Sequence, residues 1–238
     1  MTSLLTVGNP KTAKGEARGY LTAVLHLAPA DAAGGPTVCP MATAGCKAAC
    51  LNTAGRGGIF KAGERTNVIQ EARKRRTREY HADPAAFAER LAGDVARHVA
   101  RARRAGLTPA VRVNGTSDLP RLAHAMAKRF PDVQFYDYTK IPRPWARTLP
   151  NYHLTFSRSE DNWRGALSAA EQAVRHGVSV AVVFSTRRGR PLPSYFAGHL
   201  VVDGDMSDLR FLDARGVVVG LRAKGRARRD TSGFVVAA

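Results

Sequence analysis

The sequence predicts an α/β fold with parallel strands, arranged as a full or partial (β/α) barrel. Three observations lead to this prediction. Short apolar runs alternate with helical segments or connectors, and parallel neighbours need such a crossover. Nearly every run ends in polar or charged residues. About seven runs can be counted, which suits a barrel better than a long open sheet. We therefore expect a single α/β domain over residues 1–238.

The first half of the chain supplies one strand and two helices. Residues 20–27 predict a strand that prolines and glycines close. Residues 66–80 have a helical composition with charge on most faces. Asp83 and Pro84 supply a cap and a proline at the first helical position. The helix that they open keeps an apolar stripe and ends near Gly106.

In the second half of the chain, predicted strands alternate with predicted helices or connectors. Further strands are expected at residues 110–113, 133–136, 152–156, 178–184, 200–202 and 216–221. Helices are expected at residues 119–130 and 163–176. Basic residues dominate the last part of the chain, which we expect to form a basic C-terminal tail over residues 222–238.

Polar side chains that follow the strands are candidates for a site. In α/β sheets and barrels, ligands bind at the carboxyl ends of parallel strands. The residues expected at that rim are Asn114, Asp118, Asp137, Lys140, Ser157, Arg158 and Asp203. The simpler alternative is that strands finish at the surface, where polar residues are common. The site hypothesis gains force because a cysteine loop follows the first predicted strand.

Cys39, Cys46 and Cys50 are the only cysteines of the chain and follow the pattern C-P-x5-C-x3-C. They lie in a turn-rich loop, residues 36–58. Three thiols cannot close a disulfide framework, and a zinc site made of thiolates alone needs four. Three thiolates suit a [4Fe–4S] cluster with one iron left open or completed from elsewhere. The sequence therefore predicts that Cys39, Cys46 and Cys50 bind such a cluster.

Two other interpretations of the cysteines stay open. A zinc ion could take the three thiolates together with a borrowed His or Asp. The cysteines could also be packed as small apolar side chains. Pro40 and Gly45 argue against plain packing, because they make a loop in which backbone amides can point at sulfur.

The charge of the chain predicts a polyanionic partner. Lys and Arg number 37 against 19 Asp and Glu, a formal charge of +18. Such a charge speeds encounter with polyanions, and nucleic acid is the expected partner. The alternative is that the chain comes from a high-GC genome, whose proteins accumulate arginine for codon reasons and need no specific partner. The arginine-rich runs lie at residues 73–78, 101–104, 187–190 and 222–229. The nucleic-acid contacts are expected from a helix outside the cysteine loop, at Arg73, Lys74, Arg75, Arg76 and Arg78.

Several function classes have no motif here. Residues 55–58 form a glycine-rich turn without the P-loop pattern, so a flexible turn is favoured there over a phosphate cradle. No metalloprotease or hydrolase motif occurs. The start of the chain lacks a secretion signal and no run reaches membrane-spanning length, so we expect a cytoplasmic protein without membrane contact.

A strand followed at once by a loop with three cluster-binding cysteines, heading a (β/α) barrel, resembles the radical SAM superfamily. The spacing differs, because that superfamily usually has C-x3-C-x2-C and this chain has C-x6-C-x3-C. The resemblance implies that the open iron binds S-adenosylmethionine. The strand-end residues expected to face this iron and its ligand are Asn114, Asp118, Asp137 and Lys140.

The motifs also resemble a family of bacteriophage proteins, the gene product 88 proteins. The resemblance is carried by GNPKTAKG at residues 8–15, the cysteine loop with LNTAGR at residues 51–56, and RTN at residues 65–67. It extends to the strand ends at residues 114–118 and 136–140. It implies a phage protein that acts in the cytoplasm of the infected host cell, and it supplies no reaction.

Overall fold

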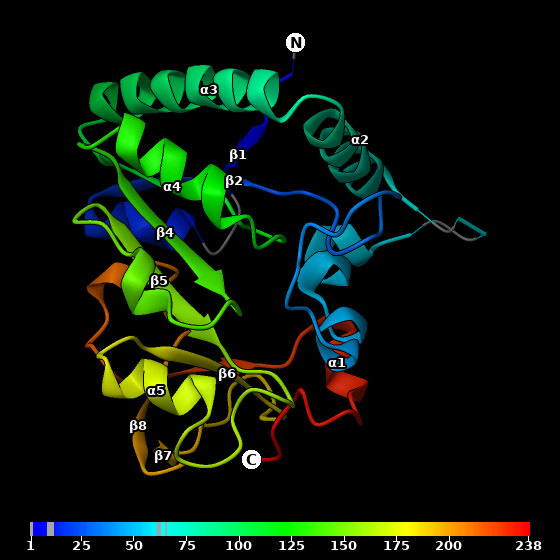
Figure 1. The fold of residues 1–238 in the computed structure, drawn as a ribbon, viewed down its shortest axis with the longest axis vertical. Coiled ribbons are helices and arrows are strands. Elements are labelled where there is room, and N and C mark those ends of the chain that lie inside the picture. Colours follow the sequence, from blue (N-terminus) through cyan, green and yellow to red (C-terminus); the bar gives the residue numbers. More distant parts are fainter. Residues whose placement is uncertain (1, 9–11, 61–62, 65) are drawn as a thin grey trace.

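The computed structural model describes residues 2–8, 12–60, 63–64 and 66–238. Residues 9–11 and Arg65, which belong to two of the motifs above, lie outside the described residues. The described residues form a mixed α/β fold with a nine-stranded, mostly parallel sheet (Figure 1). The predicted fold class is therefore confirmed at the level of a parallel α/β protein.

The strands lie in the order β1-β2-β3-β4-β5-β6-β9-β8-β7. Their bounds are β1 Leu5–Val7, β2 Tyr20–Leu25, β3 Thr108–Arg112, β4 Gln134–Thr139, β5 Tyr152–Ser157, β6 Val180–Phe184, β7 Tyr195–Phe196, β8 His199–Asp203 and β9 Val218–Arg222. β1 and β7 are antiparallel to their neighbours and form the two edges, and all other pairs are parallel. No pair of described strands joins these edges, so closure into a barrel is not confirmed.

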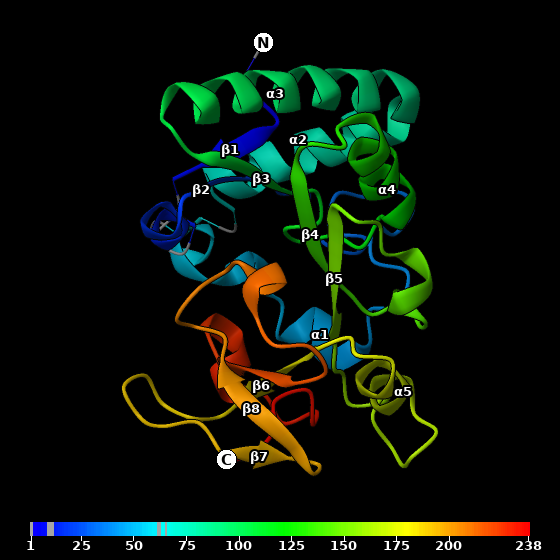
Figure 2. The ribbon, with the colours of Figure 1, turned by 90° about the vertical axis from the view of Figure 1, so that its left-hand side faces the viewer.

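Strands β2 to β6 lie beside one another in chain order. Right-handed crossovers that advance in one direction place their helices on one face of a sheet. The helices are α1 Ala44–Ala48, α2 Val68–Ala82, α3 Pro84–Arg104, α4 Pro120–Arg129 and α5 Ala169–Arg175. Figure 2 shows the sheet curving, with α3, α4 and α5 on its outer side. None of the described helices is long and apolar enough to cross a membrane.

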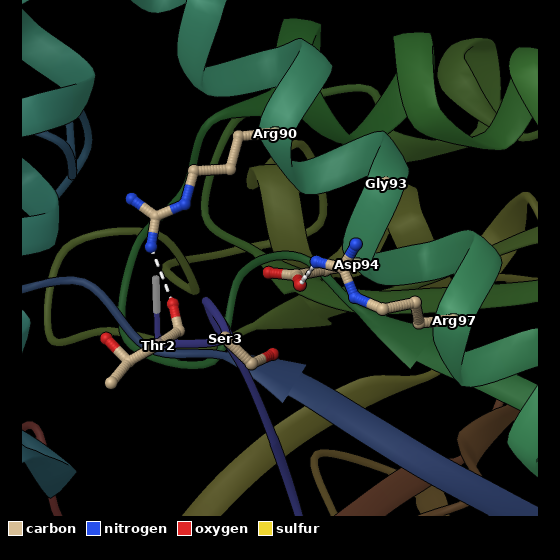
Figure 3. A pocket seen from close by; sticks show the side chains of 6 residues that line it. All are labelled: Thr2, Ser3, Arg90, Gly93, Asp94 and Arg97. Atoms are coloured by element: carbon tan, nitrogen blue, oxygen red, sulfur yellow. Dashed lines mark hydrogen bonds and ion pairs between the residues drawn. The ribbon is translucent and has the colours of Figure 1, made fainter.

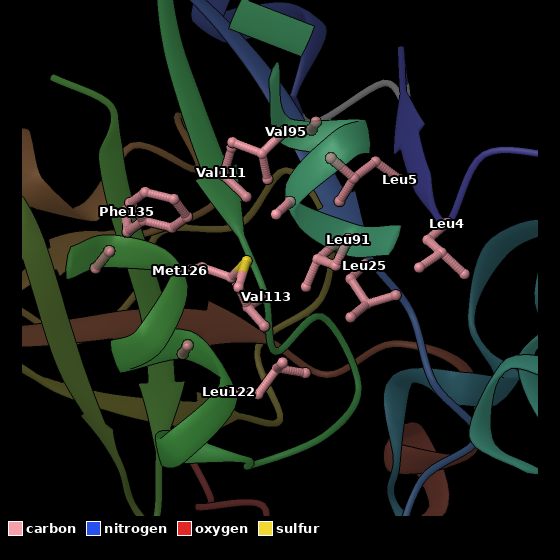
Figure 4. Packing of buried hydrophobic residues seen from close by; sticks show 14 of the residues in the cluster. Leu4, Leu5, Leu25, Leu91, Val95, Val111, Val113, Leu122, Met126 and Phe135 are labelled. Carbon is pink, nitrogen blue, oxygen red and sulfur yellow. The ribbon is translucent and has the colours of Figure 1, made fainter. Parts of the chain in front are cut away.

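The main core lies between α3, α4 and the first parallel strands (Figure 4). Asp83 caps α3 by accepting hydrogen bonds from the amides of Ala85 and Ala86, and Pro84 opens the helix, as the sequence predicts. Leu91 of α3 and Met126 of α4 are buried against this face of the sheet. The predicted apolar stripes therefore hold the helices on the strands.

The concave face of the sheet holds a polar cluster that the sequence did not reveal. Arg112 of β3 forms an ion pair of 3.0 Å with Asp208, and the hydroxyl of Tyr136 donates to the same carboxylate. Leu209 packs against Tyr136, and Figure 2 shows this orange segment within the curve of the sheet. The segment that follows β8 therefore fills the concave face.

Several elements differ from their predicted bounds. The strands β1 and β7 are too short for periodicity to detect. Helix α5 begins at Ala169 rather than at residue 163, because Gly165 has a left-handed backbone and Ser168 caps the helix. Strand β4 continues through Asp137 to Thr139, so that Asp137 lies inside the sheet rather than beyond its end.

The basic C-terminal residues pack back onto the fold. The short 3-10 helix Gly225–Arg229 follows β9, and its Ala227 clusters with Ala49 and Phe234 against Cys46. Val236 lies beside β6, where its amide donates to Val183 over 2.8 Å. The expected tail is thus part of the structure around the cysteine loop.

Candidate metal centre

Hydrogen bonds fix the cysteine loop just before Cys39 and again at Cys46. The amide of Asp118 donates to the carbonyl of Val38 over 2.8 Å, which ties the residue before Cys39 to the turn after β3. Thr43 caps the short helix α1, since its hydroxyl accepts from the amide of Cys46 over 3.1 Å. The sequence signal for this helix is a threonine three residues before a cysteine, which the prediction of a plain loop overlooked.

The three thiols are free, half-buried and mutually close enough to interact electrostatically. Burial raises the pKa of Cys39 to about 11, and negative charge on Cys50, Cys46 and Asp118 raises it further, against a hydrogen bond from the amide of Ala30. Burial also raises the pKa of Cys50, whereas the charges of Lys140 and Arg73 lower it. Metal binding would supply the positive charge that deprotonates such thiols.

Backbone amides point at two of the sulfurs. The amide of Ala30 donates to the Sγ of Cys39 over 3.3 Å, and that of Asn52 donates to the Sγ of Cys50 over 3.5 Å. Such donors stabilise a thiolate and tune the potential of an iron–sulfur cluster. The amide of Asn52 lies in the loop, as expected, whereas that of Ala30 comes from the segment before it.

The described part of the chain contains no group of three or more His, Cys, Asp or Glu side chains placed to hold one metal ion. One tetrahedral zinc would bring its sulfurs to about 3.8 Å from one another, given a Zn–S bond of about 2.3 Å. A cubane cluster instead binds each thiolate to its own iron, so the sulfurs need not meet at one point. Three half-buried thiols, two of them with amide donors and one with cations nearby, are a donor set that fits such a cluster.

Glu160 braces the cysteine helix and was not among the predicted site residues. Its Oε1 accepts from the amide of Gly45 over 2.8 Å, and its Oε2 accepts from the hydroxyl of Thr43 over 2.8 Å. A Cβ at Gly45 would collide with the side chains of Ser232 and Glu160, so a larger residue there would displace this contact. The available signal was weak, because Glu160 is simply the first acidic residue after β5.

Asp118 and Lys140 lie beside the cysteines, as the sequence predicts. Asp118 Oδ2 accepts from the hydroxyl of Thr139 and from the amide of Lys140, over 3.1 and 2.8 Å. Burial raises the pKa of Asp118, which interacts electrostatically with Cys39. The ammonium group of Lys140 lies 5.4 Å from the ring centroid of Phe234 and lowers the pKa of Cys50.

Asn114 and Asp137 are hydrogen-bonded to each other and support the turn that carries Asp118. Asp137 accepts from the backbone and side-chain amides of Asn114, over 2.8 and 3.1 Å, and from the hydroxyl of Tyr152. Asn114 Oδ1 in turn accepts from Ser117 and Leu119, which shapes the turn that carries Asp118. Both side chains are buried, and burial raises the pKa of Asp137 to about 7. Direct contact of this pair with a cofactor stays a prediction.

The expectation that the basic helix lies outside the cysteine loop is wrong for Arg73. Its guanidinium donates to the carbonyl and the side-chain oxygen of Asn52, over 3.2 and 2.6 Å, next to Cys50. Local periodicity could not reveal this contact, because it joins α2 to a loop. Arg73 is thus part of the cysteine site.

The other cations of α2 differ in their surroundings. Arg76 donates to the carbonyl of Ser3, Arg78 donates to that of Ala33, and Lys74 pairs with Glu71. Arg75 is exposed. Most cations of this run therefore bind other residues of the protein. Their contact with nucleic acid stays a prediction.

The remaining rim residues all contact other parts of the protein. Arg158 donates to the carbonyls of Gly233 and Phe234, and so holds the end of the chain against the site. Asp203 forms an ion pair with Arg222 over 2.9 Å. Ser157 accepts from the side-chain amide of Asn162 through its carbonyl. These three residues shape the rim by binding to the protein itself.

The family model described as Gene product 88 matches residues 3–238. The chain belongs to the Gene product 88 family. No curated protein and no solved structure matches it. The resemblance to this bacteriophage family, which the cysteine loop and the strand ends suggested, is therefore confirmed. The resemblance to the radical SAM superfamily receives no support from these comparisons.

Proposed function

We propose that this Gene product 88 protein binds a [4Fe–4S] cluster through Cys39, Cys46 and Cys50. The observation that carries the proposal is the loop itself: its three thiols are half-buried, interact electrostatically, and two of them accept hydrogen bonds from backbone amides. When bound through three thiolates, such a cluster supplies electron transfer and an open iron for a small ligand.

The surrounding residues have defined roles in this proposal. Arg73 and Lys140 place positive charge near Cys50, which offsets the negative charge of the thiolates. Glu160 and Thr43 fix the helix that carries Cys46. Asp118 stands near Cys39 and is the polar group that would meet a ligand on the open iron. Clustered thiols of this kind persist in a reducing compartment, so we place the protein in the cytoplasm of the infected cell.

The finer proposal is that the open iron binds S-adenosylmethionine and that the protein is an enzyme. It rests on the chain order of a cysteine loop after a strand of a parallel sheet. The alternative is a protein that binds nucleic acid and uses the cluster for structure or redox sensing. The charge of +18 favours contact with nucleic acid in either case.

The cluster is tested by preparing the protein without oxygen and recording its absorption. We expect a broad absorption band at about 400 nm, which arises from thiolate-to-iron charge transfer in a cluster. Alanine at Cys39, Cys46 or Cys50 should abolish the band. Met41→Ala is the matched control, because Met41 lies in the same loop, is 46% exposed and carries no thiol. A colourless protein that holds zinc at these cysteines would contradict the proposal.

The enzyme and the binding protein are separated by one further assay. The cluster-loaded protein is mixed with dithionite and S-adenosylmethionine, and 5′-deoxyadenosine is measured by chromatography. Its formation, lost in the Cys46→Ala variant, supports an enzyme. An intact cluster without this product supports the binding protein.

A further inference from the structure

A hollow of about 370 Å³ adjoins the cysteine loop. Its described lining comes from two distant parts of the chain: Thr53, Gly58, Phe60, Gly225, Arg226, Arg228 and Arg229. The first three residues follow Cys50, and the others form the turn and 3-10 helix after β9. The fold thus joins the glycine-rich turn to the last arginine-rich run. Volumes of roughly 300–1,000 Å³ are typical of small-molecule sites.

Glycines let the two segments meet at the backbone of Thr53. A Cβ at Gly58 would collide with the carbonyl of Thr53. Gly225 has a φ of +56°, and a Cβ there would lie 3.1 Å from the same oxygen. The contact is continuous with the metal centre, since the hydroxyl of Thr53 donates to the carbonyl of Cys50 over 3.2 Å. A ligand in the hollow would therefore lie beside Cys50.

The arginines of the hollow differ from their neighbours in lacking partners. Arg226, Arg228 and Arg229 are exposed, and no described residue forms an ion pair or a side-chain hydrogen bond with them. Just before them, Arg222 pairs with two aspartates and Lys224 pairs with Asp205. The nearby carboxylate of Asp230 accepts from Ser232 and Val235. Three unpaired guanidinium groups around one hollow select an anion.

A second hollow shows the contrast (Figure 3). It measures about 430 Å³ and lies between the start of the chain and α3. Its arginines are paired, because Arg90 contacts Glu79 and the carbonyl of Thr2, and Arg97 contacts Asp94. The contact with Thr2 fastens the start of the chain to α3, and the two ion pairs neutralise the charges of these arginines. The hollow beside Cys50 is the one whose charge is available to a ligand.

We propose that the hollow beside Cys50 binds the phosphate of a nucleotide within a single-stranded nucleic acid, with a base stacked on Phe60. The guanidinium groups suit phosphate, and aromatic rings stack on the bases of single strands. A duplex keeps its bases stacked inside, where Phe60 cannot reach them. This inference rests on the part of the proposed function in which the protein contacts nucleic acid, and it names where the contact lies.

The test measures binding of a short fluorescent single-stranded oligonucleotide by anisotropy. The triple variant R226Q/R228Q/R229Q should weaken binding at least tenfold and make the salt slope shallower by about 0.7, the value for one phosphate neutralised on a single strand. The matched control is R187Q/R188Q/R190Q, which removes the same charge from exposed arginines on another loop. It should change the affinity by less than about threefold, the effect of long-range charge alone.

The stacking contact has its own pair of variants. Phe60→Ala should weaken binding roughly tenfold, the usual loss for one stacked base, while Phe60→Trp should retain it. Ile59→Ala, a change at the adjacent exposed residue, should have no effect. Circular dichroism and the absorption of the metal centre verify that each variant is folded.

The outcomes separate the inference from the proposed function. Equal losses in the two triple variants would refute the hollow as the site while contact with nucleic acid stands. If adenosine monophosphate binds as tightly as the strand, the ligand is a free nucleotide and the strand is refuted. If wild-type protein binds none of these probes at low salt, the nucleic-acid part of the proposed function fails as well. The cluster is judged separately by its absorption.

Discussion

Two pairs of polar residues lie at the carboxyl ends of the same strands, β3 and β4, and have different partners. Asn114 and Asp137 are buried and bind each other and their neighbours. Asp118 and Lys140 lie farther along the chain and interact electrostatically with the cysteines. The difference shows that the earlier polar residue of each pair serves the sheet, whereas the later one lies beside the cysteines.

The buried pair positions the rim pair. Asn114 accepts from Ser117 and Leu119 and thereby fixes the turn that carries Asp118. Asp118 then accepts from the amide of Lys140 and orders the end of β4. Buried polar groups that are fully hydrogen-bonded make a rigid support. Changes at Asn114 or Asp137 should therefore lower the free energy of unfolding more than a change at Lys140.

The largest effect is expected from the ionisation of Asp137. Its pKa of about 7 in the folded protein exceeds the ordinary value, so the folded state binds more protons than the unfolded state between these values. The free energy of unfolding should therefore fall as pH rises from about 4 to about 7, by up to about 4 kcal/mol, and then level off. Urea unfolding of wild type and Asp137→Asn across pH measures this. A difference between the two proteins that stays constant over this window would contradict it.

Removing Asn114 should destabilise the protein more than removing the charge of Lys140. Asn114→Ala leaves Asp137 with fewer donors and should lower the free energy of unfolding by about 2–3 kcal/mol. Lys140→Met loses a cation–π contact and a positive charge near Cys50, and it should cost less than about 1 kcal/mol. Urea unfolding at pH 8 measures both. Equal losses would mean that the rim residue is as structural as the buried one.

A smaller effect is expected at Arg73, which separates the two kinds of arginine on α2. Arg73→Met removes a charged hydrogen bond to Asn52 and should raise the proteolysis rate of the loop about tenfold, since such bonds contribute roughly 1.5–3 kcal/mol. Arg75→Met is the matched control, because Arg75 is exposed on the same helix. Limited proteolysis measures the rates. Indistinguishable rates in these two variants would show that Arg73 does not hold the loop.

Much of the fold follows from local sequence patterns. The seven predicted strands all occur, and the capped helix after Asp83 ends close to its predicted residue. Their periodicity and caps are local signals. Strands β1 and β7 and the short helix α1 were missed, because two to five residues carry too little pattern to stand out.

The site could be predicted only where its residues lie close together in the sequence. Three cysteines in one loop are visible in the sequence, but the contacts of Arg73 and Glu160 join segments that are distant along the chain. Asp137 and Asp118 are the same residue type and both are buried, and they differ in the partners that the fold gives them. The hollow beside Cys50 also needs the fold, since it forms where the glycine-rich turn meets the last arginines.

The central claim is that three thiolates of one loop bind a four-iron cluster. Native mass spectrometry of the protein, prepared and sprayed without oxygen, tests it most directly. The account predicts that the chain gains the mass of four irons and four sulfides and that Cys50→Ala loses this gain. A chain that carries one zinc ion, or no metal after reconstitution with iron and sulfide, would contradict it.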